Sequence, residues 1–300
     1  MTNILVVGSL NTDLVVRTPR FPQPGETISG EDLQVIPGGK GANQAVAASR
    51  MGSEVSMLGR VGKDNFGDFL LENLKTNNVD SQLVQRDDSS TGTAIIVVDA
   101  NGQNSIVLSP GANGKVSSSD IEHASFSDFD LLLLQLEIPI PTVLSAAKLA
   151  KQNGVRVLLN PAPAKELPEE LISLADFLIP NETELSLLTG MEVKDIPTAE
   201  KAAHALLQRG VQNVIVTLGS NGALIVTNKS TSHISPFKVD VVDTTAAGDA
   251  FIGGFASVLD TANSLEEAVR YGCACGALAT TKFGAQPSLP TKQEIERFIV

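Results

Sequence analysis

The chain has 300 residues, 42% of them hydrophobic, which is enough for one large α/β domain or two medium ones. Its formal net charge of −12 argues against a nucleic-acid-binding surface, and no apolar run reaches the roughly 18 residues of a membrane span. Met1 to Gly8 has no basic start, so we expect no signal peptide, and the only cysteines, Cys273 and Cys275, exclude a disulfide framework and favour a reducing cytoplasm.

Strand and helix patterns alternate along most of the chain. Short apolar runs predict strands at residues 4–7, 55–58, 131–136, 155–159, 177–179 and 214–217. Amphipathic or small-residue patterns, two of them opened by capping boxes at Ser264 and Thr291, predict helices at residues 41–51, 68–77, 142–153, 248–260, 265–282 and 291–298. This alternation predicts an α/β fold with a mostly parallel central sheet and helices on both faces.

Two segments interrupt the alternation. Residues 14–36 are extended and rich in proline turns, and residues 93–108 predict a hairpin that turns at Asn101 and Gly102. We expect these strands to form one small β-sheet, a lid beside the main domain. The predicted organisation is therefore a single α/β domain over residues 1–300, with a lid from about 14–36 and 93–108.

The motif Asp-Thr-Thr-Ala-Ala-Gly-Asp, which ends at Asp249, follows a predicted strand at residues 239–242 and opens a helix. The amides of Ala246, Ala247 and Gly248 would point out of the helix start, where unpaired N–H groups and the helix dipole favour anions. A carboxylate beside such an anion suits proton transfer during phosphoryl transfer, so Asp249 is the candidate base. A helix start should make it a weak base, and its ordinary alternative is to stabilise the helix end.

Further polar residues stand where predicted strands end, the edge at which open α/β sheets bind ligands. Asn11 and Asp13 follow the first strand, and Glu137 follows residues 131–136. Lys40 and Asn43 belong to a glycine-rich loop that opens a helix. Each of these has an ordinary alternative as a turn, an exposed strand end or a loop before a packed helix.

Some patterns exclude other classes of enzyme. No Gly-x-x-x-x-Gly-Lys-Ser/Thr motif is present, and no Gly-x-Gly-x-x-Gly follows a strand, which disfavours a P-loop NTPase and a dinucleotide-binding enzyme. His123, His204 and His233 lack the spacing of a zinc site, so we expect them to be structural.

The glycine-rich segment from Gly38 to Asn43 and the segment from Asp243 to Asp249 together resemble the ribokinase-type branch of the PfkB carbohydrate kinase family. The resemblance covers nearly the whole chain. It implies a ribokinase-like α/β fold with a small β-sheet lid, ATP as phosphoryl donor, Mg²⁺, an activating K⁺ and a homodimer formed through the lids.

The resemblance also implies residue roles. Asp249 would deprotonate the attacking hydroxyl, while developing charge would be stabilised by Ala246, Ala247 and Gly248. Sugar hydroxyls would be bound by Asn11, Asp13, Gly39, Lys40, Gly41, Asn43, Glu137 and Asp249. The nucleotide would be bound by Asn181, Thr217, Leu218, Gly219, Ser220, Asn221, Gly222 and Gly248. K⁺ would be held by Asp243, Thr245, Ala279, Lys282, Gly284 and Ser288, and Mg²⁺ would be organised through water by Glu184. Without the resemblance, the pair Asn181 and Glu184 could be only a helix cap, and residues 217–222 only a turn.

Finer detail favours phosphorylation of D-ribose at O5. The segment Asn160-Pro-Ala-Pro-Ala164 resembles that branch, and a polar Asn11 suits a sugar with a 2-hydroxyl, because deoxyribose kinases tend to carry an apolar residue there. Ala250 departs from the threonine common after the catalytic aspartate and keeps the helix. The alternatives are a deoxyribokinase, a fructokinase or a nucleoside kinase. A non-catalytic sugar sensor of the same fold and a nicotinamide oxidoreductase are further alternatives.

Overall fold

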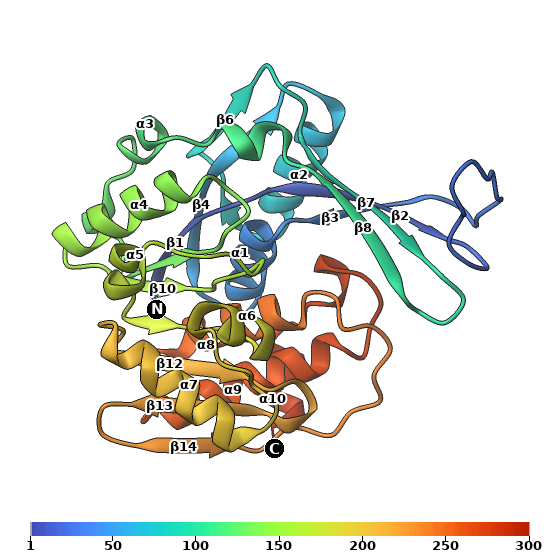
Figure 1. Cartoon of the computed structure of the whole chain (residues 1–300). Coiled ribbons are helices and arrows are strands. Elements are labelled where there is room, and N and C mark those ends of the chain that lie inside the picture. Colours follow the sequence, from blue (N-terminus) through green and yellow to red (C-terminus); the bar gives the residue numbers. More distant parts are fainter. Residues whose placement is uncertain (1, 300) are drawn as a thin grey trace.

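A computed structural model describes residues 2–299 as an α/β fold with two sheets (Figure 1). In the large sheet the strand order is β14-β13-β12-β11-β10-β9-β1-β4-β5, and β6 also pairs with β4. The strands from β12 to β5 run parallel, and β13 and β14 pair antiparallel at one end. This confirms the predicted mostly parallel sheet; the two ends of the predicted domain, residues 1 and 300, lie outside the described residues.

The strands of the large sheet are β1 (Asn3–Val7), β4 (Glu54–Gly62), β5 (Val79–Asp80), β6 (Val84–Asp87), β9 (Leu131–Leu134), β10 (Arg156–Leu159), β11 (Phe177–Leu178), β12 (Asn213–Thr217), β13 (Ala223–Thr227) and β14 (Thr231–Ile234). The helices are α1 (Lys40–Arg50), α2 (Asn65–Thr76), α3 (Ser118–Ile121), α4 (Ile140–Gln152), α5 (Glu169–Leu174), α6 (Glu182–Thr189), α7 (Ile196–Gln208), α8 (Ala247–Val258), α9 (Leu265–Ala279) and α10 (Lys292–Phe298). Short 3-10 turns are η1 (Gly111–Lys115), η2 (Phe126–Asp128), η3 (Gly219–Asn221) and η4 (Gln286–Ser288). No helix within residues 2–299 combines the length and the apolar character needed to cross a bilayer.

Helices cover both faces of the large sheet, as predicted. Side chains of β1 alternate between the faces, because successive residues of a strand point to opposite sides. Ile4 and Val6 join a core with residues of α1, α2, α8, α9 and α10, whereas Leu5 and Val7 join a second core with residues of α3 to α7. Burial of the central parallel strands on both faces explains why β1, β9 and β10 are apolar runs.

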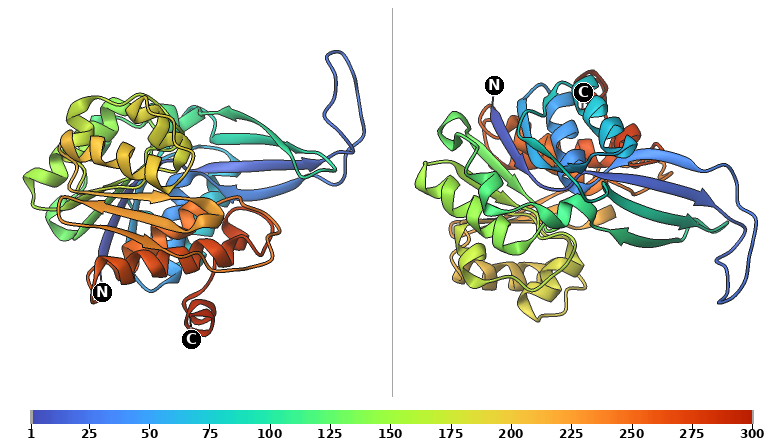
Figure 2. Two further views of the ribbon diagram at one scale, coloured as in Figure 1. Left: turned by 60° about the horizontal axis from the view of Figure 1, so that its bottom comes forward. Right: turned by 90° about the horizontal axis from the view of Figure 1, so that it is seen from above.

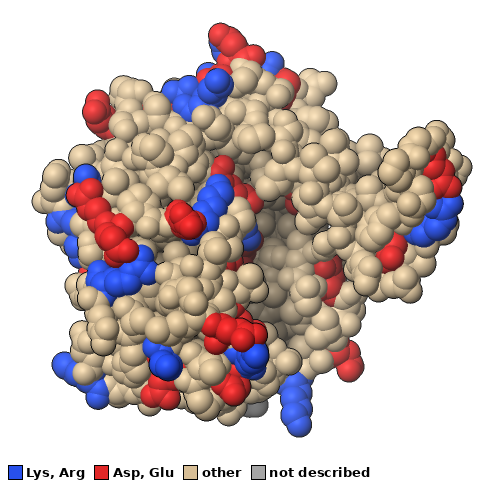
Figure 3. Space-filling model, viewed as in Figure 1, with Lys and Arg blue, Asp and Glu red and all other residues tan. Residues whose placement is uncertain are grey.

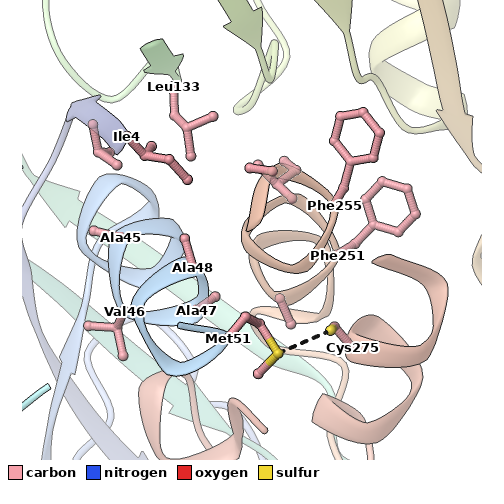
Figure 4. Close-up of a cluster of buried hydrophobic side chains, with 14 of the residues drawn as sticks. Ile4, Ala45, Val46, Ala47, Ala48, Met51, Leu133, Phe251, Phe255 and Cys275 are labelled. Carbon is pink, nitrogen blue, oxygen red and sulfur yellow. Dashed lines mark hydrogen bonds between the residues drawn. The ribbon is translucent and has the colours of Figure 1, made fainter. Parts of the chain in front are cut away.

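Helices α1 and α8 pack unusually closely because their contact surfaces carry small residues. A Cβ atom added to Gly253 of α8 would lie 2.4 Å from the Cβ of Ala47 on α1. Figure 4 shows Ala47 and Ala48 of α1 beside the helix that carries Phe251 and Phe255. This close packing matters for the site, since it brings the first turn of α1 next to the first turn of α8.

The second sheet projects from the main body (Figures 1 and 2). Its order is β3-β2-β7-β8, with β2 (Asn11–Arg17), β3 (Gln34–Gly38), β7 (Gly92–Val98) and β8 (Asn104–Ser109). Its strands come from both segments that interrupt the alternation, although β2 begins three residues earlier than expected, at Asn11. Strands β7 and β8 form the predicted hairpin, and Gly102 in its turn has a φ of 77°.

Three local predictions are wrong or incomplete. Residues 239–242 form no strand: Val241 and Val242 are 62% and 64% exposed, and the amide of Val242 donates to the carbonyl of Thr280 at 2.8 Å. The apolar run resembles a buried strand but lies outside the sheet, on the end of α9. That helix ends at Ala279 and does not continue to Lys282. At its start Ser264 caps the helix, but Glu267 bonds to Asn263, so the capping box is one-sided.

Candidate active site

The carboxyl ends of the parallel strands form one polar edge of the large sheet. The polar residues at this edge are Ser9, Glu137, Asn160, Asn181 and Thr217, at or just beyond the ends of β1, β9, β10, β11 and β12. Figure 3 shows the surface hollowed between the main body and the projecting second sheet, with charged side chains inside the hollow. Ligands of open α/β sheets bind at such an edge, so this is the candidate active site.

Asp249 lies in the first turn of α8 and is only 5% exposed. Its Oδ2 accepts a hydrogen bond from Nδ2 of Asn43 at 2.9 Å, and its Oδ1 accepts one from Nε2 of Gln44 at 3.0 Å. Burial raises the pKa of Asp249, although the ammonium group of Lys40 opposes the rise. Contrary to the prediction that the helix start makes Asp249 a weak base, the pKa of Asp249 lies above its usual value, because burial outweighs Lys40 and the hydrogen bonds from Asn43 and Gln44.

The backbone before α8 has the geometry of an anion cradle. Ala246 has a φ of 58°, in the left-handed region that alanine rarely adopts, and the residues after it are helical. This alternation turns successive N–H groups toward one side, as in anion-binding nests. The amides of Ala246 and Gly248 donate to no acceptor within residues 2–299, whereas the amide of Ala247 donates to the carbonyl of Thr244 at 3.2 Å. Two of the three predicted amides are thus available to an anion, and the third closes the turn.

Glu137 is tied to the glycine-rich loop. Its Oε2 accepts hydrogen bonds from the hydroxyl of Ser9 at 2.5 Å and from the amide of Lys40 at 3.0 Å. Burial lowers the pKa of the Lys40 ammonium, but the carboxylates of Asp249, Glu137 and Glu184 together raise it more, so the side chain stays charged. A half-buried cation among carboxylates can bind hydroxyl oxygens and offset negative charge.

The glycine-rich loop needs glycine where it crosses the end of β1. Gly39 has a φ of 87°, and a Cβ atom there would lie 2.7 Å from the amide nitrogen of Asn11. A Cβ atom on Gly41 would lie 2.6 Å from the amide nitrogen of Ser9. The loop therefore lies directly on the turn between β1 and β2, which brings Lys40 and Asn43 to the residues that begin the second sheet.

Asn11 is buried and held by a residue that the sequence did not single out. Nδ2 of Asn113 donates to Oδ1 of Asn11 at 2.7 Å and to the carbonyl of Leu10 at 3.0 Å, and Oδ1 of Asn113 accepts the amide of Leu10 at 2.9 Å. Because the carbonyl oxygen of the Asn11 side chain faces Asn113, its NH₂ group is left to donate elsewhere. No local signal in the sequence links Asn113, in η1, to Asn11.

Asp13 lies two residues further along β2 and is 8% exposed. Burial, reinforced by the nearby carboxylates of Glu137 and Asp249, raises the pKa of Asp13 to about 7. Asn11 and Asp13 share one side of β2, as their alternation predicts. Both are therefore placed with Lys40, Asn43, Glu137 and Asp249 at one site.

The predicted nucleotide-binding residues lie at the far end of the same edge. Asn181 and Glu184 form a reciprocal capping box at the start of α6, in which both oxygens of Glu184 accept hydrogen bonds from Asn181, at 2.9 and 3.0 Å. The backbones of Asn181 and Thr217 also form an isolated parallel β-bridge. Beyond Leu218, which is buried, residues 219–221 form an exposed 3-10 turn that ends at Gly222, with a φ of 86°.

Of the predicted cation-binding residues, Thr245 and Gly284 contact Asp243 directly, and the backbone amide of Asp243 donates to the carbonyl of Thr280, the residue after Ala279. Oδ1 of Asp243 accepts the amide and hydroxyl of Thr245 at 2.9 and 2.7 Å, and its Oδ2 accepts the amide of Gly284 at 2.9 Å. Burial alone would raise the pKa of Asp243, but these hydrogen bonds lower it below its usual value, so the carboxylate is charged. The ammonium group of Lys282 pairs with Glu294, and the hydroxyl of Ser288 donates to the carbonyl of Ala285. Ala279 ends α9 in the same region, and no three His, Cys, Asp or Glu side chains of residues 2–299 gather as a metal-binding group.

No role was assigned from the sequence to three buried amide side chains behind Asp249. Gln44 bonds directly to Asp249, and Gln135 and Asn160 bond to Gln44. All three were visible as polar residues in otherwise apolar stretches, either in the small-residue helix or at the end of a buried strand. A buried amide is expected to have partners, but the partner cannot be named without the fold.

Comparison with known proteins extends over the whole chain. Residues 1–292 match the sequence pattern of the pfkB family carbohydrate kinases. The chain is 43% identical over 299 residues to a ribokinase of Haemophilus influenzae, covering 99% of this chain and 98% of that one. It is 40% identical over 301 residues to a deoxyribokinase of Salmonella typhi, with coverage of 99% and 98%. A solved structure of Arabidopsis thaliana ribokinase complexed with ribose and ATP is 35% identical, with a TM-score of 0.92 and coverage of 99% and 98%.

Proposed function

The chain belongs to the pfkB family of carbohydrate kinases, and we propose that it transfers the γ-phosphoryl group of ATP to O5 of D-ribose, giving ribose 5-phosphate and ADP. One observation carries the proposal. A buried carboxylate of raised pKa, Asp249, lies beside the amides of Ala246 and Gly248, which donate to no acceptor among residues 2–299. The carboxylate can take a hydroxyl proton while the amides hold a phosphoryl group.

In the proposed step, O5 of the sugar attacks the γ-phosphorus and its proton passes to Asp249. A bond forms between O5 and phosphorus, and the bond from phosphorus to the oxygen that bridges to the β-phosphate breaks, releasing ADP. Charge on the transferred group is held by the amides of Ala246 and Gly248 and by the dipole of α8. Ala247 acts by keeping the turn closed through Thr244.

The sugar hydroxyls are proposed to lie among Asn11, Asp13, Gly39, Lys40, Gly41, Asn43, Glu137 and Asp249. Support comes from their chemistry, because this set mixes carboxylates, an ammonium group and amides that are buried or half-buried. Such groups favour a ligand with several hydroxyls, each able to donate and accept. The glycines allow the backbone to approach it closely.

The nucleotide is proposed to lie over the far end of the edge. Its base and ribose would contact the turn formed by Thr217, Leu218, Gly219, Ser220, Asn221 and Gly222, and its phosphates would extend past Asn181 to Gly248. Support comes from the arrangement of strand ends, since β11 and β12 bring Asn181 and Thr217 together. The γ-phosphate would then end at the anion cradle.

Mg²⁺ is proposed to accompany the phosphates, with Glu184 acting on it through water. Both oxygens of Glu184 already accept hydrogen bonds from Asn181, and the side chain is buried, so a water-mediated role fits it better than direct coordination. Burial raises the pKa of Glu184, although its hydrogen bond from Asn181 and the charge of Lys40 oppose the rise. When bound, Mg²⁺ would neutralise charge on the phosphates.

K⁺ is proposed to be held by the carboxylate of Asp243 and by oxygens of Thr245, Ala279, Lys282, Gly284 and Ser288. The residues fit a monovalent cation, because Asp243 is charged and the other groups are neutral oxygens. Lys282 would contribute only its carbonyl, since its ammonium group is held 2.6 Å from Glu294. When bound, K⁺ would offset the charge of Asp243 just before the cradle.

Ribose is preferred to 2-deoxyribose because of Asn11. The relatives alone do not separate the two sugars, since a ribokinase and a deoxyribokinase match with similar identity. Asn113 holds the Oδ1 of Asn11, so the NH₂ group of Asn11 remains to donate to a sugar oxygen such as the 2-hydroxyl. A site built around that hydrogen bond disfavours a sugar that lacks the oxygen.

The second sheet is proposed to act as a lid and as the contact between two copies of the chain. On its face opposite Asp13, the register aligns Val35, Leu14, Ile95 and Val107 in one row across all four strands. Val35, Ile95 and Val107 are 45%, 49% and 63% exposed. An apolar row of this kind favours burial against a partner, and a second copy offers the same row.

We propose that the protein works in the cytoplasm. Its two cysteines are free and buried, and burial raises the pKa of the Cys273 thiol to about 12, which makes the thiol unreactive. Neither thiol needs an oxidising compartment for the fold.

The test is release of ADP in a coupled assay with ribose, 2-deoxyribose, fructose and nucleosides, each with and without K⁺. We expect ribose to be the best acceptor and K⁺ to increase turnover. If ribose is inert while another sugar is phosphorylated, the substrate is wrong and the kinase assignment stands. If no acceptor releases ADP from ATP, the kinase proposal itself fails.

A further inference from the structure

We propose that Gln44, Gln135 and Asn160 form an amide relay that orients Asp249 and keeps a hydrogen-bond donor on its Oδ1. The proposal rests on the function proposed above, because it concerns the base of that reaction. None of the three is among the residues proposed to touch sugar or nucleotide. They are positioning residues, and their effect reaches the reaction only through Asp249.

The relay begins at a backbone carbonyl. Nδ2 of Asn160 donates to the carbonyl oxygen of Ile179 at 3.0 Å. A carbonyl can only accept, so the amide of Asn160 has one allowed orientation, with its Oδ1 facing Gln44.

The orientation of Gln44 follows from that of Asn160. Nε2 of Gln44 donates to Oδ1 of Asn160 at 3.2 Å and to Oδ1 of Asp249 at 3.0 Å, which uses both of its hydrogens. Oε1 of Gln44 accepts Nε2 of Gln135 at 2.6 Å. Reversing the Gln44 amide would place its carbonyl oxygen against two other oxygens and its NH₂ group against another NH₂ group. Asp249 therefore always meets a donor from Gln44.

The relay crosses the middle of the sheet edge. Ile179, Asn160 and Gln135 follow the neighbouring strands β11, β10 and β9, and Gln44 comes from α1. Gln44 and Gln135 have no exposed surface, so a ligand in the hollow does not replace their contacts. The ends of β9, β10 and β11, which lie between the proposed sugar and nucleotide sites, thus position Asp249.

Gln135 is kept in a position where its side-chain oxygen gains no hydrogen bond from the described residues and where its neighbour must be glycine. Its Oε1 has no hydrogen-bond partner within residues 2–299, and a Cβ atom added to Gly8 would lie 2.1 Å from that oxygen. Leaving a buried amide oxygen unpaired costs about 1–3 kcal/mol. Only the donor end of Gln135 is used, and it is used on Gln44.

The relay also acts on the charge of Asp249. The carboxylate faces the charged groups Lys40, Glu137, Asp13 and Glu184, and burial raises its pKa. Hydrogen bonds from Asn43 and Gln44 favour its charged form and oppose that rise. Removing the Gln44 donor should therefore raise the pKa of Asp249 further and leave its carboxylate held by Asn43 alone.

The first test is Gln44→Met, which keeps an unbranched side chain of similar length without a donor. We expect kcat to fall about 10- to 100-fold and KM for the sugar to change by less than about threefold. The acidic limb of the kcat–pH profile should move about one pH unit upward, since the base must lose a proton that it now holds more tightly. Gln44→Glu, which keeps the shape and still accepts from Gln135, should move the limb in the same direction, because two carboxyl groups then share the site.

The second test is a double-mutant cycle with Gln135→Met, run on the sugar that the wild-type protein phosphorylates best. We expect Gln135→Met to lower kcat about three- to tenfold alone and to cost nothing further in the Gln44→Met background. Thermal unfolding and ATP binding of each variant show whether it is folded.

Two results would overturn the relay. Folded Gln44→Met and Gln44→Glu variants could keep kcat within threefold with an unmoved acidic limb, or Gln135→Met could cost the same in both backgrounds. Wild-type activity separates the proposals: an active wild type with unaffected variants removes the relay alone. A wild type that phosphorylates no sugar removes the kinase function and the relay with it.

Discussion

The two buried aspartates of the site belong to different regions and are held in different ways. Asp249, in the main body, receives one hydrogen bond on each oxygen from amides of α1. Asp13, on β2 of the second sheet, is nearly as buried, yet its pKa of about 7 reflects burial and neighbouring carboxylates, and no side chain or amide of residues 2–299 donates to it. The main body thus supplies hydrogen-bond donors to Asp249 before any ligand binds, whereas a bound ligand would have to supply the donors to Asp13.

The difference follows from how each region is built. The start of α8 is fixed by close packing on α1 and by polar groups at adjacent strand ends. The second sheet has only four strands, and every residue of its edge strand β8 is exposed. Preorganised dipoles favour phosphoryl transfer, since they need not reorient when charge develops. A looser region suits capture of a sugar, because it can close around the hydroxyls.

The largest effect is expected from Asp249→Asn, which tests the main body alone. The variant keeps the size of the side chain but cannot accept a proton, so kcat should fall about 10³-fold or more while ribose binding changes little. Calorimetry with ribose and the ADP-release assay measure the two quantities on the same preparation. Asn43→Ala serves as a contrast, because it removes a donor to Asp249 and a proposed sugar contact but retains the base. Turnover of Asp249→Asn near the wild-type rate would contradict the role of Asp249.

The next effect concerns Asp13 and the stability of the ligand-free protein. Its folded-state pKa is raised from 3.8 to about 7, so between these values the folded chain holds a proton that the unfolded chain has lost. Stability should therefore be greatest below the lower value and fall by up to about 4 kcal/mol as pH rises through 7. Urea unfolding at several pH values measures this slope.

Two variants of that experiment sharpen the comparison. Asp13→Asn should flatten the slope, because the amide does not titrate. Saturating ribose should also flatten it, since hydroxyls that donate to Asp13 favour its charged form. An unchanged slope in Asp13→Asn would show that this carboxylate is not the titrating group.

How much the sequence could predict also differs between the two regions. The parallel sheet, its helices and the accessory strands follow from periodicity and turn residues, and the motifs place Glu137 after a strand and Lys40 and Asp249 at helix starts. The strand predicted at residues 239–242 is wrong, because its β-branched apolar residues are exposed beside a helix end and are not paired in a sheet.

Contacts between distant residues could not be predicted in either region. The link from Asn113 to Asn11 and the relay to Asp249 join residues about 100 or more positions apart in the chain. The left-handed backbone at Ala246 was equally hidden, since alanine normally disfavours it. Such features depend on how elements pack, which local patterns do not encode.

A smaller effect is expected from Asn11→Met, at the joint between the two regions. Losing the NH₂ donor should lower the ratio of kcat/KM for ribose to that for 2-deoxyribose about tenfold. The variant also leaves Asn113 without one acceptor, but that loss of stability is common to both substrates and cancels in the ratio. Assays of both sugars with one enzyme preparation suffice. A ratio that does not change would show that Asn11 does not bind the 2-hydroxyl.

The smallest effect is expected from Ala246→Gly. This variant tests whether the anion cradle depends on the methyl group of Ala246 or only on its left-handed backbone. Glycine adopts a φ of 58° without strain, which favours the folded state by about 1 kcal/mol. It also adds freedom to the unfolded chain, which opposes folding by about 0.4–1 kcal/mol. The two nearly cancel, so stability should change by less than about 1 kcal/mol and kcat by less than about threefold. Ala246→Val is the matched contrast, because a β-branched residue fits the left-handed region poorly and should lose both stability and kcat. If glycine lost kcat as valine does, the methyl group would matter and the preorganised backbone alone would not explain the cradle.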